Sequence, residues 1–405
     1  MKRRKKPISQ VITFREEDLI NPVREAHEKR FHFRSGEKKL AVMALALFLT
    51  LAAVLILPYD FVNKPVSAAR YVTAVSDRLS LFWGLISGEG NHDAVLYALC
   101  TGMIVILTGG CLAMCGSVFQ GIYHTPMASP SMMGIHSGGM LAAVAYLFFF
   151  GNASEGEAFY TYDEYNTYLS TLSLYDLYAR QIWMIAGSLA GACIVIFLST
   201  RAGRGRVSTI VLILTGSLFS SFAGLVSSLG QYYFTYKDPT TNRVYALMSI
   251  SMGNFANAYL PQHLLMIGVP VLICAGFLWK MSPGLNLLMF GDQEAAAMGM
   301  NIESFRRRSF LLCLIPSAML LAFCGQIGFV GLLVPHFARQ IAGSDYRRLI
   351  PASLLLGGIV MLLIYGAAVC TGLTAGINLV SSVAGGVISL MFLMRYRRSR
   401  NADWA

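Results

Sequence analysis

The residues most able to do chemistry lie in a short polar segment, residues 285–308, between two long apolar segments. Three acidic residues, Asp292, Glu294 and Glu303, stand there among alanines and glycines, and three consecutive arginines follow them. Alanine and glutamate favour helix, so we expect short polar helices. Exposed, charged helices held between apolar segments suit the docking of a soluble partner protein. The segment shows no pairing of a nucleophile with a base that would indicate catalysis.

Residue patterns typical of enzymes and metal sites are missing from the rest of the sequence as well. There is no GxxxxGK(S/T) phosphate loop, no Gly-Lys pair and no HExxH, and the seven His are scattered. The eight Cys lie inside apolar segments or at their ends, and only Cys111 and Cys115 share a helical face. We interpret them as small packing residues. The sequence therefore predicts no catalytic residue, no metal site and no cofactor bound by this chain.

Hydropathy predicts that the elements positioning the polar segment are membrane helices. Of the 405 residues, 55% are hydrophobic and 13% charged, and the mean hydropathy is +0.57. A helix satisfies its own backbone groups in lipid, and about 20 apolar residues cross about 30 Å of hydrocarbon. We therefore predict an all-α polytopic bundle of about ten transmembrane helices, at 40–57, 94–121, 131–150, 181–200, 207–229, 262–280, 309–325, 327–343, 350–370 and 375–394.

Two further expectations follow from this division. The chain has three parts: a basic, polar leader at 1–39, a transmembrane domain at 40–394 with an inner polar segment at 281–308, and a basic tail at 395–405. The glycines between 325 and 331 predict an irregular break between the seventh and eighth helices.

The net charge of +11 is interpreted as an orientation signal. If ten segments alternate across the membrane, 25 of the 32 Lys and Arg fall on one side and six in the opposite loops. Such residues concentrate in cytoplasmic loops, so both termini and the polar segment are predicted to be cytoplasmic. The basic excess also attracts anionic membrane lipid, and its distribution predicts no nucleic-acid partner. The leader shows no cleavable signal peptide, and we interpret it as a solvated arm; contact with lipid or a partner is the alternative.

Four blocks of residues stand in order along the chain, at 116–138, 285–299, 325–339 and 343–351. Together they resemble the membrane permease subunits of bacterial ABC importers for ferric siderophores, haem and cobalamin. The first, 116–138, is similar to the family motifs G-x-x-x-Q-x, N-P-L-A-x-P and L-G-x-x-x-G. The second, 285–299, looks like the family's cytoplasmic coupling segment. The third reads GQIGFVGLLVPHFAR (325–339) and the fourth GSDYRRLIP (343–351). The order of the blocks and the spans between them make the resemblance specific.

The resemblance implies a multi-pass protein of the bacterial cytoplasmic membrane that forms the pathway for a ferric siderophore or a similar metal chelate. Its implied partners are a second permease subunit, giving a homodimer, a cytoplasmic ABC ATPase dimer that uses the ATP, and an extracytoplasmic substrate-binding protein. An internal echo, Cys115-Gly116 against Cys324-Gly325, fits two inverted-repeat-like halves.

The resemblance also assigns roles to three sets of residues. Coupling to the ATPase is expected at Asn286, Gly291, Asp292, Glu294, Ala295, Ala296 and Gly299. A pathway or gate is expected at Gln120, Ser208, Thr209, Gln326 and Asn378. Structural motif positions are Pro126, Pro130, Gly134, Gly331, Pro335, His336, Arg339, Asp345 and Arg348. The polar residues of the second set suit hydrogen bonds between helices equally well, and Ser208 and Thr209 suit a helix cap.

One departure from the family motifs and two alternative functions stand beside this interpretation. The arginines with which the family meets its binding protein are replaced by Ala98 to Thr101, so the Tyr-rich loop 151–180 is a candidate docking surface as well as a headgroup-level belt. A self-contained secondary transporter would need an ionisable residue at mid-membrane, and the apolar segments contain almost none. A membrane receptor or scaffold would transport nothing.

Overall fold

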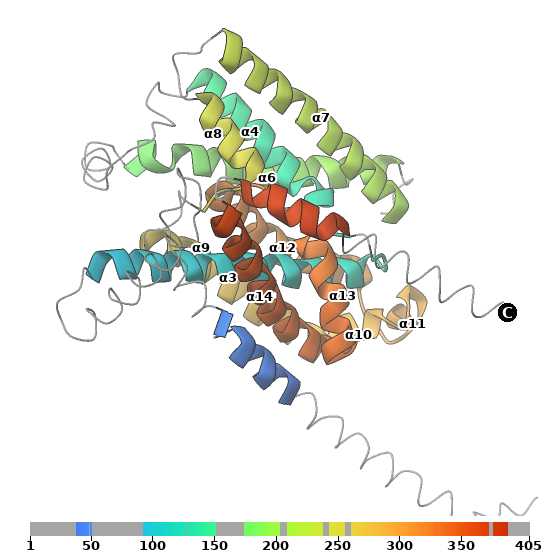
Figure 1. The fold of residues 1–405 in the computed structure, drawn as a ribbon. Coiled ribbons are helices and arrows are strands. Elements are labelled where there is room, and N and C mark those ends of the chain that lie inside the picture. Colours follow the sequence, from blue (N-terminus) through green and yellow to red (C-terminus); the bar gives the residue numbers. More distant parts are fainter. Residues whose placement is uncertain are drawn as a thin grey trace, which may run out of the picture.

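Every regular element in the described residues is a helix. The computed structural model describes residues 38–47, 49–50, 92–126, 128–150, 174–202, 209–237, 243–255, 261–371 and 376–387. The proposed leader, the Tyr-rich loop and the basic tail lie almost entirely outside these residues. Figure 1 shows the helices gathered into one bundle, with α3 (His92–Ile122) through its middle.

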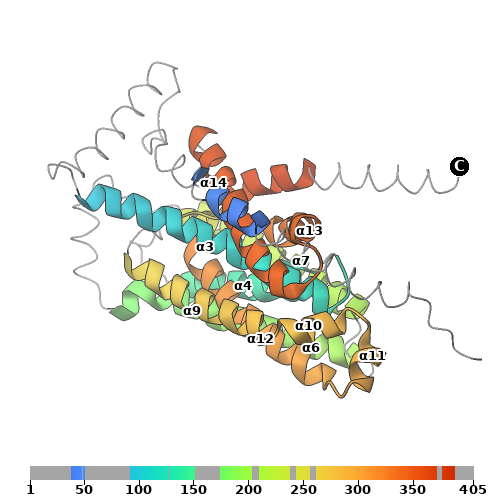
Figure 2. The same ribbon diagram turned by 90° about the horizontal axis from the view of Figure 1, so that it is seen from below.

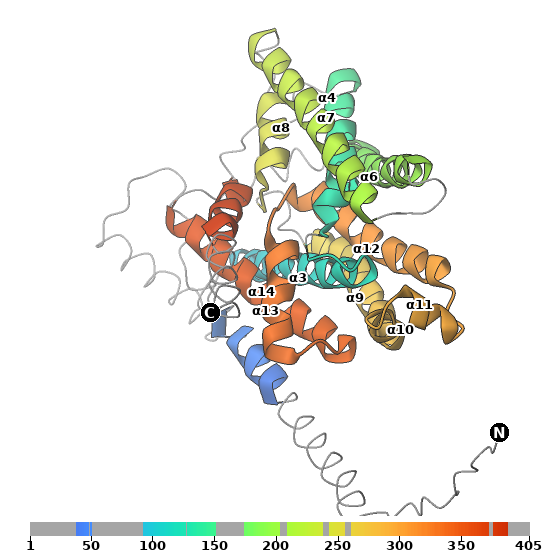
Figure 3. The same cartoon turned by 90° about the vertical axis from the view of Figure 1, so that its right-hand side faces the viewer.

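The remaining elements fall into two groups and a set of short connections. Around α3 lie α9 (Pro261–Lys280), α12 (Ile302–Cys324), α13 (Val330–Ala342) and α14 (Tyr346–Thr371). Farther out lie α4 (Ile135–Phe149), α6 (Leu174–Ala202), α7 (Thr209–Tyr236) and α8 (Arg243–Met252). The short elements are η2 (Pro130–Met133), α10 (Ser282–Leu288) and α11 (Asp292–Ala297). Figures 1 and 3 show α4, α7 and α8 on the side of the bundle away from α10.

Six described helices are long and apolar enough to cross a membrane: Leu99–Ile122, Tyr178–Ala202, Ile210–Tyr236, Pro261–Lys280, Ile302–Cys324 and Tyr346–Val369. Two shorter apolar helices, Ile135–Phe149 and Ile377–Val387, lie within other predicted spans. The all-helical fold class is therefore confirmed, while the number of ten crossings stays a prediction.

Helix α3 is the core of the bundle because glycines let its neighbours approach closely. The most apolar window of this helix is 94% buried. A Cβ added at Gly109 would lie 2.3 Å from the carbonyl oxygen of Gly357 on α14, and one at Gly116 would lie 1.7 Å from that of Gly331 on α13. In a lipid bilayer the hydrophobic effect does not drive helices together, and small residues allow the close van der Waals packing that does. These glycines therefore allow α3 to pack closely against α13 and α14.

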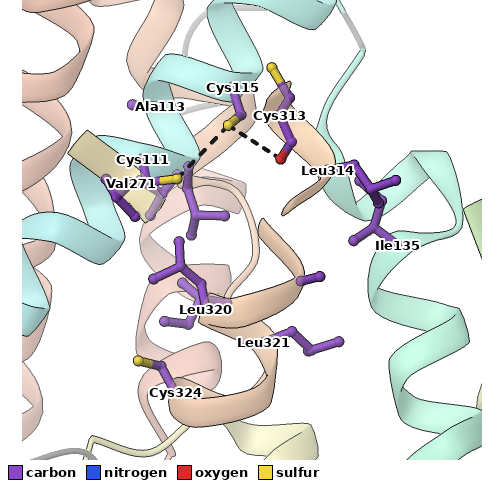
Figure 4. Packing of buried hydrophobic residues seen from close by; sticks show 14 of the residues in the cluster. Cys111, Ala113, Cys115, Ile135, Val271, Cys313, Leu314, Leu320, Leu321 and Cys324 are labelled. Carbon is purple, nitrogen blue, oxygen red and sulfur yellow. Dashed lines mark hydrogen bonds between the residues drawn. The ribbon is translucent and has the colours of Figure 1, made fainter. Parts of the chain in front are cut away.

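Buried cysteines fill part of the same core (Figure 4). Cys115 Sγ lies 3.9 Å from Cys111 Sγ and 3.7 Å from the carbonyl oxygen of Cys313. Of the seven cysteines whose side chains are described, six are buried and Cys193 is exposed. The burial agrees with a packing role for the six.

Three predicted helix boundaries are wrong by about two turns. The fourth span was predicted to start at 181, but α6 begins at Leu174. The fifth predicted span ends at 229, but α7 continues to Tyr236, because Phe234 is fully buried and holds the last turns against the bundle. The segment after it was expected to be an outer loop, yet it contains the ten-residue helix α8. The seventh span starts at 309 in the prediction, whereas α12 begins at Ile302, where the side chain of Asn301 accepts a hydrogen bond from the Ser304 nitrogen.

The predicted break between the seventh and eighth helices is present at residues 325–329, and it meets two other helix ends. The backbone nitrogen of Gln326 donates to the carbonyl oxygen of Ile250 at 2.8 Å, and that of Asn254 donates to Cys324 at 2.9 Å. The side chain of Asn378, near the start of the 377–387 helix, accepts from the Gly328 nitrogen at 2.9 Å. We call residues 250–254, 324–328 and 377–378 the helix-end junction. It satisfies backbone groups that lipid would leave unpaired.

Candidate functional site

Helices α10 and α11 and the start of α12 form a polar projection at one end of the bundle (Figures 1 and 2). The chain reverses after α10 at Gly291, whose φ of +111° is a conformation that favours glycine. In α11 only Ala295 is buried. Exposed apolar side chains flank this helix: Phe290 is 71% exposed and Met298 68% exposed. An exposed mixture of acidic and large apolar groups is suited to a protein contact.

Helix α10 is fastened to the start of α14. The Asn286 side chain donates to Asp345 Oδ1 at 2.6 Å and accepts from the Tyr346 nitrogen at 2.8 Å. The indole Nε1 of Trp279, at the end of α9, donates to the carbonyl oxygen of Arg347 at 3.0 Å. These contacts place the projection against the first turn of a long apolar helix.

The projection is also fastened to the end of α3. His124 Nε2 lies 2.7 Å from the carbonyl oxygen of Leu288, the last residue of α10. Arg306 donates from Nε to the carbonyl oxygen of Ile122 at 2.8 Å and forms an ion pair with Asp292 at 2.8 Å. Polar contacts therefore join the projection to the bundle at two places, the end of α3 and the start of α14.

The predicted coupling residues are brought together in this projection, but not all on its surface. Asp292, Glu294, Ala296 and Gly299 are exposed, whereas Asn286 and Gly291 are half-buried and Ala295 is fully buried. Gly299 has a φ of +85° and open space around its Cα, so backbone conformation accounts for glycine there. The buried position of Ala295 suits attachment of α11 to the bundle.

Arg339, a predicted motif residue, and Gln120, a predicted pathway residue, belong to a polar group where α3, α13 and α14 meet. The Arg339 guanidinium donates to Gln120 Oε1 and, at 3.4 Å, to the Ser117 carbonyl oxygen. Gln120 Nε2 donates to the Leu332 carbonyl oxygen at 3.0 Å, and the hydroxyl of Tyr346 to Ser117 at 3.3 Å. This group joins the same two helices to which the projection is fastened.

The other motif residues lie at turns and helix crossings. Pro130 is buried at the start of η2, and Pro126 is exposed just before it. Gly134 begins α4 with a φ of +78°, where a Cβ would lie 2.5 Å from Val195. Pro335 is buried inside α13, and His336 and Arg348 are half-buried and have partners.

Two predicted pathway residues, Gln326 and Asn378, lie in the helix-end junction, whereas Gln120 on α3 bonds to α13. Gln120 and Asn378 make hydrogen bonds between helices, which was the alternative interpretation of these residues, and Gln326 lies half-buried in the helix-end junction. Ser208 and the side chain of Thr209 lie outside the described residues. The described part of the chain also contains no group of three His, Cys, Asp or Glu placed to hold a metal ion.

Two side chains that fasten the projection, Trp279 and His124, were not predicted from the sequence. Arg306 was expected either to flank the docking contact or to serve as an orientation signal, but its contact with Ile122, which joins residues 184 positions apart, was not predicted. Only the unusual position of a Trp beside the last Lys of an apolar helix was a visible signal.

Comparison with known proteins identifies the family. Residues 66–395 match the model of the FecCD transport family. The chain belongs to the FecCD transport family. Its FecCD relatives include the molybdate import system permease protein MolB of Haemophilus influenzae, 31% identical over 274 residues that cover 68% of this chain and 70% of MolB. The hemin transport system permease protein HmuU of Yersinia pestis is 29% identical over 74% of this chain and 82% of its own.

A third relative and one solved structure are also similar to this FecCD chain. The cobalamin import system permease protein BtuC of Halobacterium salinarum is 28% identical over 72% of this chain and 70% of its own. A chain from a metal-chelate type ABC transporter in an inward-facing conformation has the same fold, with a TM-score of 0.67 at 23% identity over 89% of this chain and 99% of that one. The protein is therefore a multi-pass membrane permease subunit of the ABC importer class, which works with a separate ATPase and a binding protein.

Proposed function

We propose that this FecCD permease docks its ATPase through α10, α11 and the first turn of α12, and that ATP-driven movement of this projection opens the pathway to either side in turn. The observation that carries the proposal is the projection itself: a six-residue helix with one buried residue, bordered by exposed Phe290 and Met298, and fastened by polar contacts to α3 and α14. A loop that is merely exposed to solvent does not need hydrogen bonds that hold it to two helices of the bundle.

We further propose a ferric siderophore, haem or cobalamin as the cargo. The FecCD relatives named for hemin and cobalamin support a bulky metal complex, and a relative named for siderophore transport, YfhA of Bacillus subtilis, is 28% identical over 82% of this chain. MolB is named for molybdate, a small oxyanion, so a test of cargo must include it.

The proposal includes a homodimer with both termini in the cytoplasm. In the most apolar 18-residue stretch of α7, only 22% is buried inside the subunit. This exposure supports contact of α7 with a second subunit or with lipid. Lys39 Nζ donates to the carbonyl oxygen of Ile341, near the end of α13, at 3.0 Å. Helix α14 begins just after the end of α13, and Asn286 of the projection binds the first residue of α14. The Lys39 contact therefore supports an N-terminal segment on the same side of the membrane as the projection.

The test is Glu294→Lys, which reverses the charge of an exposed side chain of α11. The variant and the wild type are expressed with the partner ATPase and binding protein, and uptake of a ferric hydroxamate, haem, cobalamin and molybdate is measured. We expect Glu294→Lys to insert in the membrane at wild-type levels, to lose the ATPase on purification and to abolish uptake. Gln340→Lys, which adds a charge to an exposed position on α13, is the matched control and should transport normally. Wild-type uptake by Glu294→Lys would contradict docking at α11.

A further inference from the structure

Arg306 contacts two different helices at once from its place in the second turn of α12. Its Nη2 donates to both carboxylate oxygens of Asp292, at 2.8 and 3.0 Å, and its Nε donates to the carbonyl oxygen of Ile122, at 2.8 Å. Asp292 is the first residue of α11, and Ile122 is the last residue of α3. One guanidinium therefore joins the exposed docking helix to the most deeply buried of the long apolar helices.

The electrostatics of both helix ends favour this arrangement. The last carbonyl groups of a helix have no partner within the helix and carry partial negative charge, which attracts a cation such as Arg306. The first turn of a helix carries partial positive charge and favours an acid such as Asp292. A guanidinium donates from several nitrogens in one rigid plane, so it binds both groups together; a lysine ammonium is a single point charge.

The geometry changes the role expected of Asp292. Asp292 and Glu294 are both exposed, but both carboxylate oxygens of Asp292 accept from Arg306 Nη2. Ala295 is the only buried residue of α11, so apolar packing fixes this helix at one point. The Arg306 contact supplies a second point and determines where α11 lies relative to the end of α3.

We propose that Arg306 is a positioning residue that carries movement of α11 to the C-terminal end of α3, and that Asp292 serves this bridge instead of the ATPase surface. The inference rests on the proposed docking of the ATPase at α11. We call the contacts of Arg306 with Asp292 and Ile122 the Arg306 bridge. The two halves of the bridge are separable, because an acid at position 306 pairs with a base at position 292 but cannot donate to the Ile122 carbonyl oxygen.

The test measures amide hydrogen exchange by mass spectrometry on the full chain in lipid nanodiscs with its ATPase, with and without a non-hydrolysable ATP analogue. Two stretches are followed, 292–299 in the projection and 115–124 at the end of α3. The variants are Arg306→Lys and the exchanged pair Asp292→Arg with Arg306→Asp. Arg307→Ala is the matched control, since Arg307 is the exposed neighbour with the same charge.

We expect all variants to co-purify with the ATPase and to keep the nucleotide response of 292–299. At 115–124, the nucleotide-dependent change in amide exchange should be about tenfold smaller in the exchanged pair than in the wild type. Most of this change should also be lost in Arg306→Lys, while Arg307→Ala should respond as the wild type does. A wild-type response at 115–124 in the exchanged pair or in Arg306→Lys would overturn the bridge. Loss of the ATPase in Arg306→Lys would also overturn it, because Arg306 would then belong to the docking surface. If the wild type itself does not bind the ATPase, the proposed function fails as well.

Discussion

The side-chain amide of Asn286 donates to the carboxylate of Asp345 at 2.6 Å across the boundary between α10 and α14. The same amide accepts from the backbone nitrogen of Tyr346 at 2.8 Å, and Asp345 also accepts from the nitrogen of Arg347 at 3.0 Å. Asn286 therefore uses both its donor, Nδ2, and its acceptor, Oδ1. The pair thereby joins the polar projection to the first turn of a long apolar helix.

This pair predicts the effect of Asn286→Asp, which keeps the shape of the side chain but replaces the donating group by an oxygen. Two carboxylates would then face each other, so the variant loses a hydrogen bond to a charged group. Both residues are near solvent, so we expect a loss of about 1 kcal/mol and a fall in Tm of about 2 °C in detergent. ATP-driven uptake should fall more than stability does. Gln293→Glu makes the same chemical change on an exposed residue of α11, and it should leave Tm unchanged. Equal Tm values for the two variants would refute the link.

The crossing of α3 and α13 predicts that Gly116→Ala is strongly destabilising. The added Cβ would lie 1.7 Å from the carbonyl oxygen of Gly331, and that oxygen belongs to backbone that cannot rotate away. Forcing two packed helices apart costs about 1–3 kcal/mol or more. We expect a sharply reduced yield of folded protein in the membrane, measured by size-exclusion chromatography after solubilisation.

The matched control for this crossing is Gly276→Ala in α9. No atom lies within 4 Å of a Cβ built at Gly276, so this change meets open space. Alanine is better than glycine inside a helix by about 1 kcal/mol, and the variant should fold as well as the wild type. Equal yields of the two variants would show that the α3–α13 approach is looser than described.

The helix-end junction predicts a large effect of Asn378→Ala. Asn378 accepts from the Gly328 nitrogen and donates to the Ser251 carbonyl oxygen at 3.2 Å, so its loss leaves two backbone groups without these partners. An unpaired buried polar group costs about 1–3 kcal/mol. We expect a lower Tm and faster exchange of the amides at 325–328. Leu379→Ala, at a 54% exposed position beside it, is the control and should change neither.

The class of fold was predictable from sequence because lipid imposes long apolar helices with few charges. The glycines at 325–331 also predicted the break, since these residues permit backbone conformations that end a helix, such as the φ of +73° at Gly325. Helix α8 was not predicted, because a ten-residue helix is too short to show a membrane-length apolar run. The end of α7 was missed because its last turns, from Gln231 to Tyr236, mix polar and aromatic residues while one of them, Phe234, is buried.

The location of the candidate site was predictable, but the separate roles within it were not. Asp292 and Glu294 look alike in sequence, two positions apart in a polar segment. Both are exposed, but only the fold brings Arg306 to Asp292, and the same guanidinium donates to the Ile122 carbonyl oxygen. Contacts between residues far apart in the chain decide such roles, and residue spacing does not reveal them. The inverted-repeat halves and the cytoplasmic termini stay predictions.

The most direct test of the central claim is reconstitution of the purified chain in proteoliposomes, alone and with its ATPase and binding protein. The account predicts that the chain alone hydrolyses no ATP and accumulates none of the four cargo probes under a proton or sodium gradient. With its partners and internal or external ATP on the ATPase side, it should accumulate one of them, and Glu294→Lys should stop that accumulation. Gradient-driven uptake by the chain alone, or ATP-driven uptake unaffected by Glu294→Lys, would contradict the account.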